Sequence, residues 1–386
     1  MTNYTPSPIQ PRQPRVSAIK IIAAIVAALF ALLLGLLVLL VIGAETGLVE
    51  LMIGMVCAII PVPIYVMLLL WIDRYESEPL WMLATTFFWG ALVAIFIALI
   101  FNTGVEIIAA IATHSSEVAA NVGAIISAPI VEESAKALIL VIFFFWKKDE
   151  FDGIVDGIVY AGLAGLGFAM TENILYYGRA IQKGPEMLTA VFILRGMAAP
   201  FSHPLFTSMT GIGLGWSRQT RNGFVKFAMP ILGFMLAVLM HATWNGSAAF
   251  GGGLGFFVTY FMVMGPAFIV ILMVIHFSLR REGRIVREFL YPDYEKGFFD
   301  PREYERLCTI RGRMGMSWDA LWSQGFSGWR LRMRCNQMAS ELAFHRSRIS
   351  RGIGRDPQAA QEREANYRSS LEQLRQQIAQ RQRGMR

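Results

Sequence analysis

Long apolar runs recur along this chain, and they limit the folds open to it more than any other feature. Each run is roughly 20 residues or longer, the length with which an α-helix crosses a hydrocarbon core about 30 Å thick. Eight such runs can be placed, at residues 19–42, 51–72, 80–101, 119–146, 154–177, 188–216, 227–250 and 254–279. The sequence therefore predicts an all-α fold, a polytopic membrane bundle of about eight transmembrane helices.

The composition agrees with that fold class. Hydrophobic residues make up 55% of the chain and charged residues 16%, and the mean hydropathy is +0.47, too apolar for an ordinary soluble domain. The first run is far longer than the apolar core of a secretory signal, so we expect it to remain as an anchor. The three cysteines form no CxxC pair, which argues against a disulfide framework and against a thiolate metal site.

Basic residues predict the orientation of the bundle. If the count is eight, one side of the membrane carries Arg12, Arg15, Lys20, Lys147, Lys148, Arg218, Arg221, Lys226, Arg280, Arg281, Arg284 and Arg287. The loops on the other side carry only Arg179 and Lys183. Because Lys and Arg are retained on the cytoplasmic side, we expect a multi-pass protein with both termini in the cytoplasm.

Three regions follow from this pattern. Residues 1–18 are expected to form a disordered cytoplasmic tail, 19–279 the transmembrane domain, and 280–386 a basic, helical cytoplasmic tail. From Arg281 onward, 21 Lys or Arg stand against 13 Asp or Glu, which gives a net charge of +8. Such a tail would attract anionic lipid headgroups, although the topology rule alone also produces Arg-rich tails. Nucleic acid is not expected as a partner, and the sequence leaves the oligomeric state open.

The end of the tail has the pattern of one more helix. Asp356-Pro357 has the form of an N-cap followed by a first-turn proline. Apolar residues then recur at spacings of 4, 3 and 4, namely Tyr367, Leu371, Leu374 and Ile378. This spacing predicts a terminal helix with an apolar stripe for docking or self-association.

Polar side chains inside the apolar runs point to a function. They concentrate in four consecutive runs, the fourth to the seventh, and comprise Glu132, Glu133, Lys136, Glu172, Asn173, Arg195, His203, His241 and Asn245. A charge near the bilayer centre costs on the order of 3 kcal/mol even on lenient scales. Such residues therefore normally face the bundle interior, where they mark a pathway, a relay or an active site.

The helical spacing of the fourth run brings opposite charges together. Lys136 follows Glu132 by four residues and Glu133 by three, so it can neutralise one carboxylate in the dry interior. The two glutamates lie about 100° apart around the helix. One of them can face a site while the other is held, and the sequence leaves open which does which.

Other polar residues share helix faces. Phe168, Glu172 and Tyr176 are four residues apart and form one stripe, and His241 and Asn245 share a face in the seventh run. An imidazole beside an amide is either a metal ligand with its supporting partner or a pair that grips an oxyanion. Spacing does not choose between these two readings.

Depth places the polar residues toward one side of the membrane. Counted at about 1.5 Å per residue from the cytoplasmic ends, Glu133, Glu172 and His241 lie nearer the outer face, and His203 lies near the middle. The polar pocket should therefore open outward. Prolines on both sides of His203 would break the helix there, which is tolerated only where the backbone is buried in protein or lines a wet cavity.

Four motifs in order resemble a known family: EExxK at 132–136, FxxxENxxY at 168–176, Arg195 followed by His203, and HxxxN at 241–245. Together they look like the PrsW-type intramembrane metalloproteases. That family is a branch of the superfamily that includes the CAAX prenyl proteases and the bacteriocin-immunity proteins. The resemblance covers a motif core at 132–245, and the basic tail lies outside it.

The resemblance implies an intramembrane endopeptidase of a bacterial-type cell membrane. Its substrate would be a membrane protein cut near the extracytoplasmic face, and in the founding bacterial members that substrate is a single-pass anti-sigma factor. Bacterial PrsW-type proteins start regulated proteolysis in this way. The outward pocket inferred from depth fits that side.

A role for each residue follows from these expectations. Glu132 or Glu133 would take a proton from water. Glu172, His203 and His241 would hold a divalent metal, most plausibly Zn²⁺, because two imidazoles and a carboxylate leave a position open for water. Asn245 would orient His241 or stabilise the oxyanion. The supporting residues would be Lys136, Arg195, Phe168, Asn173 and Tyr176.

Three alternatives stay open at this point. The prenyl-protease branch has a histidine where this chain has Glu172, so a metal-free route is also conceivable, with His241 and Asn245 as the oxyanion site. A proton-coupled or ion-coupled transporter would use the same residue types, although the chain has no second copy of EExxK or HxxxN, as the internal repeats of transporters would predict. The third alternative is a non-catalytic membrane partner protein.

Overall fold

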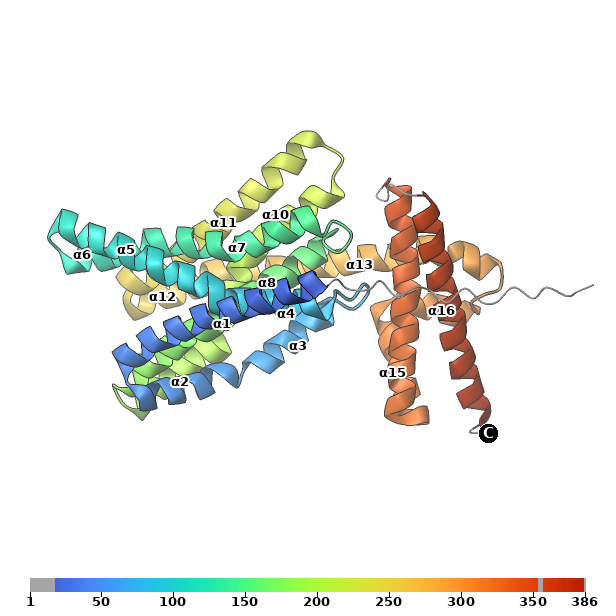
Figure 1. Cartoon of the computed structure of the whole chain (residues 1–386), viewed down its shortest axis with the longest axis horizontal. Helices are drawn as coiled ribbons and strands as arrows, with labels where there is room; N and C mark the ends of the chain where they lie inside the picture. The colour runs from blue at the N-terminus through green and yellow to red at the C-terminus, as the bar shows by residue number, and fades with distance from the viewer. Residues whose placement is uncertain (1–17, 353–356, 385–386) are drawn as a thin grey trace, which may run out of the picture.

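The computed structural model describes residues 18–352 and 357–384, and within these ranges the chain forms helices and no strand. The prediction of an all-α fold is confirmed. Long helices run side by side and form the bundle, and the C-terminal helices α15 and α16 lie across one end of it (Figure 1). The expected disordered segment at 1–18 lies almost wholly outside the described residues.

The bundle contains α1 (Ala18–Thr46), α2 (Leu48–Ile59), α3 (Val62–Ile72), α4 (Leu80–Phe88), α5 (Ile95–Thr113), α6 (Ser116–Val122), α7 (Ala128–Trp146), α8 (Ile154–Ile181), α9 (Pro185–Phe192), α10 (Ser202–Gln219), α11 (Gly223–Phe250), α12 (Gly252–Thr259) and α13 (Gly265–Glu295). Four π-helical segments join successive helices: η1 (Trp89–Ala94), η2 (Gly123–Ser127), η3 (Ile193–Ala198) and η4 (Tyr260–Met264). The tail continues with α14 (Pro301–Leu307), α15 (Ile310–Ser350) and α16 (Pro357–Gly384).

Six helical segments of the described chain are long and apolar enough to cross a membrane: Ala18–Thr46, Leu48–Ile72, Leu80–Thr113, Ile154–Ile181, Gly223–Phe250 and Gly253–Glu295. The eight runs counted in the sequence include two more, at 119–146 and 188–216. Both are helical, but the first carries three charges within α7, and the second contains Arg195 and is interrupted between η3 and α10. The count of eight and the orientation of the termini stay predictions.

Helix α8 lies at the centre of the bundle, with 89% of its most apolar window buried. Small residues let its neighbours approach to backbone contact. A Cβ built on Gly157 would lie 2.1 Å from the carbonyl oxygen of Gly211 in α10, and one on Gly167 would lie 2.0 Å from that of Phe87 in α4. This close packing fixes α8 against α10 and brings Glu172 beside His203.

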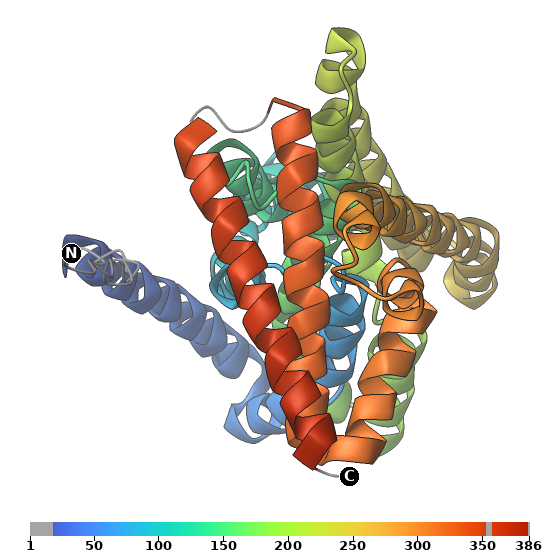
Figure 2. The ribbon, with the colours of Figure 1, turned by 90° about the vertical axis from the view of Figure 1, so that its right-hand side faces the viewer.

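Helix α13 joins the bundle to the tail without a break. It is 31 residues long, so the change of composition after Leu279 falls inside a single helix. Helix α15 bends at Gly325, where φ is 67° and ψ is −168°, and then runs back beside α16, as Figure 2 shows from the tail end of the molecule. The described tail is therefore helical, as the sequence predicts.

The predicted stripe of α16 docks within the chain. Leu371 and Ile378 are buried in the hydrophobic core, and Tyr367 and Leu374 pack against it. Helix α16 lies in contact with α15 along its length. Pro357 begins the helix as expected, whereas the proposed N-cap Asp356 lies outside the described residues.

Two loops of the bundle hold the tail. Arg348 of α15 pairs with Glu76, which follows α3, and the Arg351 Nη2 atom lies 2.9 Å from an oxygen of Asp152, which precedes α8. Burial raises the pKa of Glu76 well above its ordinary value, although the Arg348 guanidinium opposes the rise. Burial also raises the pKa values of the neighbouring Asp73 and Glu78.

Candidate active site

The polar residues predicted from the four runs do converge, and Lys136 of α7 lies in their midst. Its Nζ atom is 2.7 Å from an oxygen of Glu133 and 3.0 Å from Nδ1 of His203, and it lies 3.7 Å from Glu132. The side chain is fully buried. Its ammonium also lies 4.2 Å from the centre of the Phe168 ring, a favourable position for a cation.

Glu133 uses both of its oxygens. Oε1 accepts from Lys136 and lies 3.1 Å from Nδ1 of His241. Oε2 accepts a hydrogen bond of 2.8 Å from the Thr207 hydroxyl of α10. A fully buried carboxylate with three partners is held in place, and it has little freedom to take part in proton transfer.

Glu132 differs from its neighbour in this respect. Its Oε2 atom is buried and has no hydrogen-bond partner among the described residues. The nearest polar groups are Lys136 and Nε2 of His241, at 3.7 and 3.9 Å. Because an unpaired buried carboxylate oxygen is costly, this atom would gain stability from an external cation.

The partners of the two histidines fix their tautomers. An ammonium only donates, so Nδ1 of His203 accepts from Lys136 and its Nε2–H faces Glu172 at 3.1 Å. His241 directs Nδ1 at the Glu133 carboxylate, which only accepts. The Nε2 lone pair of His241 is therefore free, and it faces Glu132.

Arg195 holds Glu172 from η3. The guanidinium pairs with the Glu172 carboxylate, and its Nε donates a 2.6 Å hydrogen bond to the side-chain oxygen of Asn173. It also lies 3.8 Å from the centre of the Tyr176 ring. Of the supporting residues predicted from the sequence, Arg195, Asn173 and Tyr176 thus lie around Glu172. Lys136 and Phe168 lie on the other side of His203.

Asn245 lies apart from this cluster. It shares a helix with His241, but its amide donates a 2.8 Å hydrogen bond to the carbonyl of Ala124 in η2. The side chain is only partly buried. In this position Asn245 ties α11 to η2, and the structure does not bring it to the two histidines.

The helix break predicted by the prolines lies just before His203. Residue Pro200 falls between the end of η3 and the start of α10, and His203 is the second residue of α10. Freed backbone carbonyls at membrane depth need partners. The hydroxyls of Tyr65 and Tyr260 supply them, each with a 2.7 Å hydrogen bond, to the carbonyls of Gly196 and Ala198.

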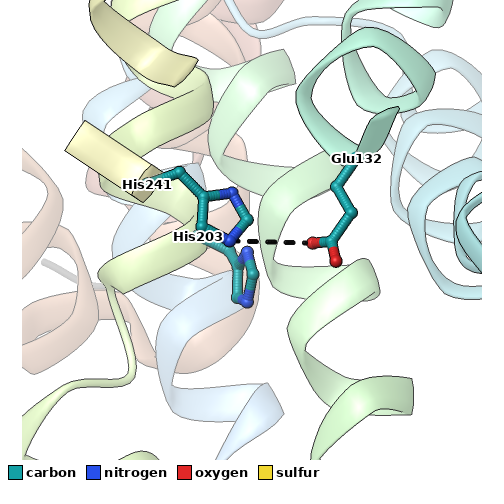
Figure 3. Close-up of side chains that lie close together, drawn as sticks. All are labelled: Glu132, His203 and His241. Carbon is teal, nitrogen blue, oxygen red and sulfur yellow. Dashed lines mark ion pairs between the residues drawn. The ribbon is translucent and has the colours of Figure 1, made fainter. Parts of the chain in front are cut away.

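Two donors of the cluster are free to bind a metal ion, the Glu132 oxygen and Nε2 of His241. A nitrogen of His203 would join them only if Lys136 or Glu172 released it. Glu132, His203 and His241 each offer one ligand atom, and these atoms lie within 4.8 Å of one another. They are the one such group in the described ranges. Figure 3 shows the two rings side by side with the Glu132 carboxylate directed at them. Two imidazoles and a carboxylate are a donor set typical of catalytic zinc sites.

Two further observations agree with a cation at this place. The unpaired Glu132 oxygen would gain a partner, and the Glu133 carboxylate on the far nitrogen of His241 is the arrangement that orients a metal-binding imidazole. With neutral histidines and all three glutamates ionised, the carboxylates exceed the charges of Lys136 and Arg195 by one. The buried cluster is therefore short of positive charge.

Sequence reasoning missed three residues that shape the site. Thr207 holds Glu133, and Tyr65 and Tyr260 hold the broken backbone. Thr207 had a signal, because it follows His203 by four residues and so shares its helix face. The two tyrosines had none, because their partners are backbone atoms far away in the sequence.

Comparisons with known proteins identify the relatives of the chain. The family described as "PrsW family intramembrane metalloprotease" matches residues 78–273. The "Protease PrsW" of Oceanobacillus iheyensis is 29% identical over 205 residues, which cover 53% of this chain and 85% of that protein. The "Protease PrsW" of Geobacillus kaustophilus is 34% identical over 143 residues, or 37% of this chain and 57% of the relative. No solved structure gives a significant match.

Proposed function

The chain belongs to the PrsW family of intramembrane metalloproteases, and on that premise we propose that it cuts a membrane protein near the extracytoplasmic face of a bacterial cell membrane. The observation that carries this proposal is the buried, unpaired oxygen of Glu132, which faces the free nitrogen of His241. It is the one place in the polar cluster where an external group has something to bind.

The metal of the proposal is Zn²⁺, which Glu132 and His241 would hold together with His203, once Lys136 or Glu172 releases one ring nitrogen of His203. The ligand set expected from the sequence had Glu172 in place of Glu132. In the structure Glu172 is engaged by Arg195 and by His203. A bound zinc ion would supply Lewis-acid polarisation of the scissile carbonyl and of a water molecule.

The residues around the ligands position them and balance their charge. Glu133 fixes the tautomer of His241, and Thr207 and Lys136 fix Glu133 in turn. Glu172 holds the ring of His203 through its Nε2–H. These contacts leave Glu132 as the carboxylate whose replacement should remove the chemistry with the least damage to the fold.

Depth supports cleavage on the outer side. In α8, Glu172 lies 18 residues after Ile154 and 9 before Ile181, or about 27 Å and 14 Å along the axis. The tail contacts the bundle just before the start of α8. If the tail is cytoplasmic, as the basic loops predict, the site lies toward the opposite face. A single-pass anti-sigma factor, the substrate class of the resemblance, would present its cut there.

Reconstitution with a single-pass substrate tests the proposal. Wild type is compared with Glu132→Gln and His241→Ala, with and without a zinc chelator, and Glu106→Gln serves as the control because that acid is exposed on α5. We expect the first two variants and the chelated enzyme to be inactive and the control to be active. Cleavage by both site variants would disprove the proposal. Cleavage that survives chelation but not Glu132→Gln would make Glu132 a metal-independent base.

A further inference from the structure

A small cavity adjoins the candidate active site. Its volume is about 130 Å³, and its walls come from the start of α10, from α11, and from η4 with the start of α13. Its lining includes Phe201, Ser202, Leu205, Trp244, Met264 and Phe268. None of the charged residues or histidines of the polar cluster lines this space.

The cavity lies close to the two histidines. Ser202 directly precedes His203, so their Cα atoms are about 3.8 Å apart, and Leu205 follows two residues later. Trp244 lies three residues after His241, which is less than one turn of α11. A peptide bond placed at the histidines would therefore have a neighbouring side chain within reach of the cavity.

The walls are apolar. The rings of Phe201 and Phe268 lie 5.7 Å apart, and those of Trp244 and Tyr260 lie 6.2 Å apart. The Tyr260 hydroxyl is already bonded to the Ala198 carbonyl. No charged side chain is among the described residues that line the cavity. Such a space favours a hydrophobic group and disfavours a charged one.

The volume sets the size of the occupant. An apolar cavity of about 150 Å³ in another protein holds a benzene ring. A cavity of about 130 Å³ therefore accommodates one branched aliphatic or aromatic side chain. It is too large to be filled by the methyl group of an alanine.

The segment η4, which forms one wall of the cavity, has exposed apolar side chains on its outer face. Phe261 and Met262 of η4 are 63% and 72% exposed, and α12 before it follows Gly251 and contains Gly253 and Gly255. A helix in the surrounding bilayer therefore needs to pass only this thin layer to reach the cavity. It does not have to cross the rest of the bundle.

We propose that this cavity binds one apolar side chain of the substrate beside the scissile bond, and that it selects substrates with a residue the size of leucine or phenylalanine there. The inference rests on the proposed proteolytic function. It adds a substrate class defined by the size and the polarity of one residue.

Two variants change the cavity in opposite directions. Phe268→Ala enlarges it and Ala199→Leu partly fills it, because both residues line the cavity. Phe277→Ala is the matched control, since Phe277 lies on the same helix α13 with 63% of its side chain exposed and is not part of the lining. None of the three residues is among the proposed ligands.

The first readout is cleavage of transmembrane peptides that differ only in the residues flanking the cut, with Ala, Leu, Phe or Trp at each position. We expect the wild-type enzyme to prefer Leu or Phe over Ala by about 10- to 100-fold in kcat/KM. Phe268→Ala should shift the preference toward Trp, Ala199→Leu should shift it toward Ala, and the control should keep the wild-type order. An unchanged preference in both cavity variants would overturn the inference.

The second readout needs no cleavage. A transmembrane peptide that carries photo-leucine at one position is irradiated with the Glu132→Gln variant, and the labelled residues are mapped by mass spectrometry. Labels on Trp244, Met264 or Phe268 that disappear in Ala199→Leu would support the cavity as a binding site. Such labels without any wild-type cleavage would refute the protease but not the pocket, and labels scattered over the bundle would refute the pocket.

Discussion

Glu132 and Glu133 are adjacent, yet their replacement by glutamine should have different effects on stability. Both carboxylates are buried, and the substitution keeps the shape of each side chain while it removes the charge. Glu133 has three partners at 2.7, 2.8 and 3.1 Å. The Oε2 atom of Glu132 has no hydrogen bond within the described chain.

The magnitudes follow from these partners. Loss of the Glu133 charge leaves the Lys136 ammonium in the interior without its closest counterion, and breaking a buried pair typically costs about 3 to 5 kcal/mol. Glu132 lies 3.7 Å from the same ammonium and makes no comparable bond. Its unpaired oxygen already costs about 1 to 3 kcal/mol, so Glu132→Gln should change the free energy of unfolding by less than about 1 kcal/mol.

The assay is unfolding of the purified protein in mixed micelles by titration with sodium dodecyl sulfate, followed by circular dichroism. A chelator is present throughout, so that metal binding does not contribute to the difference. Both variants should lose proteolytic activity, while only Glu133→Gln should lose stability. Glu106→Gln reports the effect of removing an exposed acid.

The result that would refute the reasoning is a reversed or equal pair of stabilities. If Glu132→Gln destabilised the protein as much as Glu133→Gln, Glu132 would have to be a structural partner of Lys136. The unpaired oxygen would then no longer indicate a binding position. The zinc set proposed above would lose its main support.

Three further outcomes are expected. Zinc measured by mass spectrometry on the purified protein should be about one per chain and should fall to background in His241→Ala, because that ring supplies one of three ligands. Gly157→Ala should destabilise the bundle by about 1 to 3 kcal/mol, since the added Cβ would lie 2.1 Å from a carbonyl oxygen, whereas Gly104→Ala meets nothing within 4 Å and should be neutral or stabilising. Burial raises the pKa of Glu76 because it favours the protonated carboxyl group. The stabilisation that Glu76 gives to tail docking is therefore complete below the ordinary glutamate pKa of about 4.3. It is lost as the pH rises through the raised pKa. Amide exchange in α15, corrected for intrinsic rates, should therefore be faster at pH 8 than at pH 5.5, and an opposite trend would contradict this assignment.

The sequence predicted the parts of the fold that depend on periodicity and hydropathy. The all-α class follows from the apolar runs, because a chain in lipid has to satisfy its backbone within each segment. The stripe of α16 was predictable for the same reason, since Leu371 and Ile378 repeat at helical spacing. The convergence of the polar residues followed from their cost in the bilayer.

The roles within the site depend on contacts that no spacing encodes. The choice between Glu132 and Glu133 is set by the rotation of α7 and by Thr207, which reaches across from α10. Asn245 shares a face with His241, but a carbonyl of the π-helix η2 takes its amide. A π-helix has no signature in the apolar pattern, so this partner was not foreseeable.

The difference between eight apolar runs in the sequence and six sufficiently apolar helical segments in the described structure has a physical origin as well. The segments at 119–146 and 188–216 carry four of the five charged residues of the candidate site, Glu132, Glu133, Lys136 and Arg195, so a criterion based on hydropathy passes over these two segments. In the structure α7 buries Glu133 and Lys136 completely. Burial inside the bundle, which the sequence does not display, makes such segments tolerable at membrane depth.

The unbroken course of α13 links two distant places mechanically. Its 31 residues span about 46 Å. One end lines the apolar cavity through Gly265 and Phe268, and near the other end Asp293 is gripped by Arg346 and Arg368 of the tail. A rod of this length acts as a lever, because a tilt of about 5° at one end displaces the other by about 4 Å. A movement of the tail at one end of α13 would therefore shift the cavity wall at the other end of the same helix.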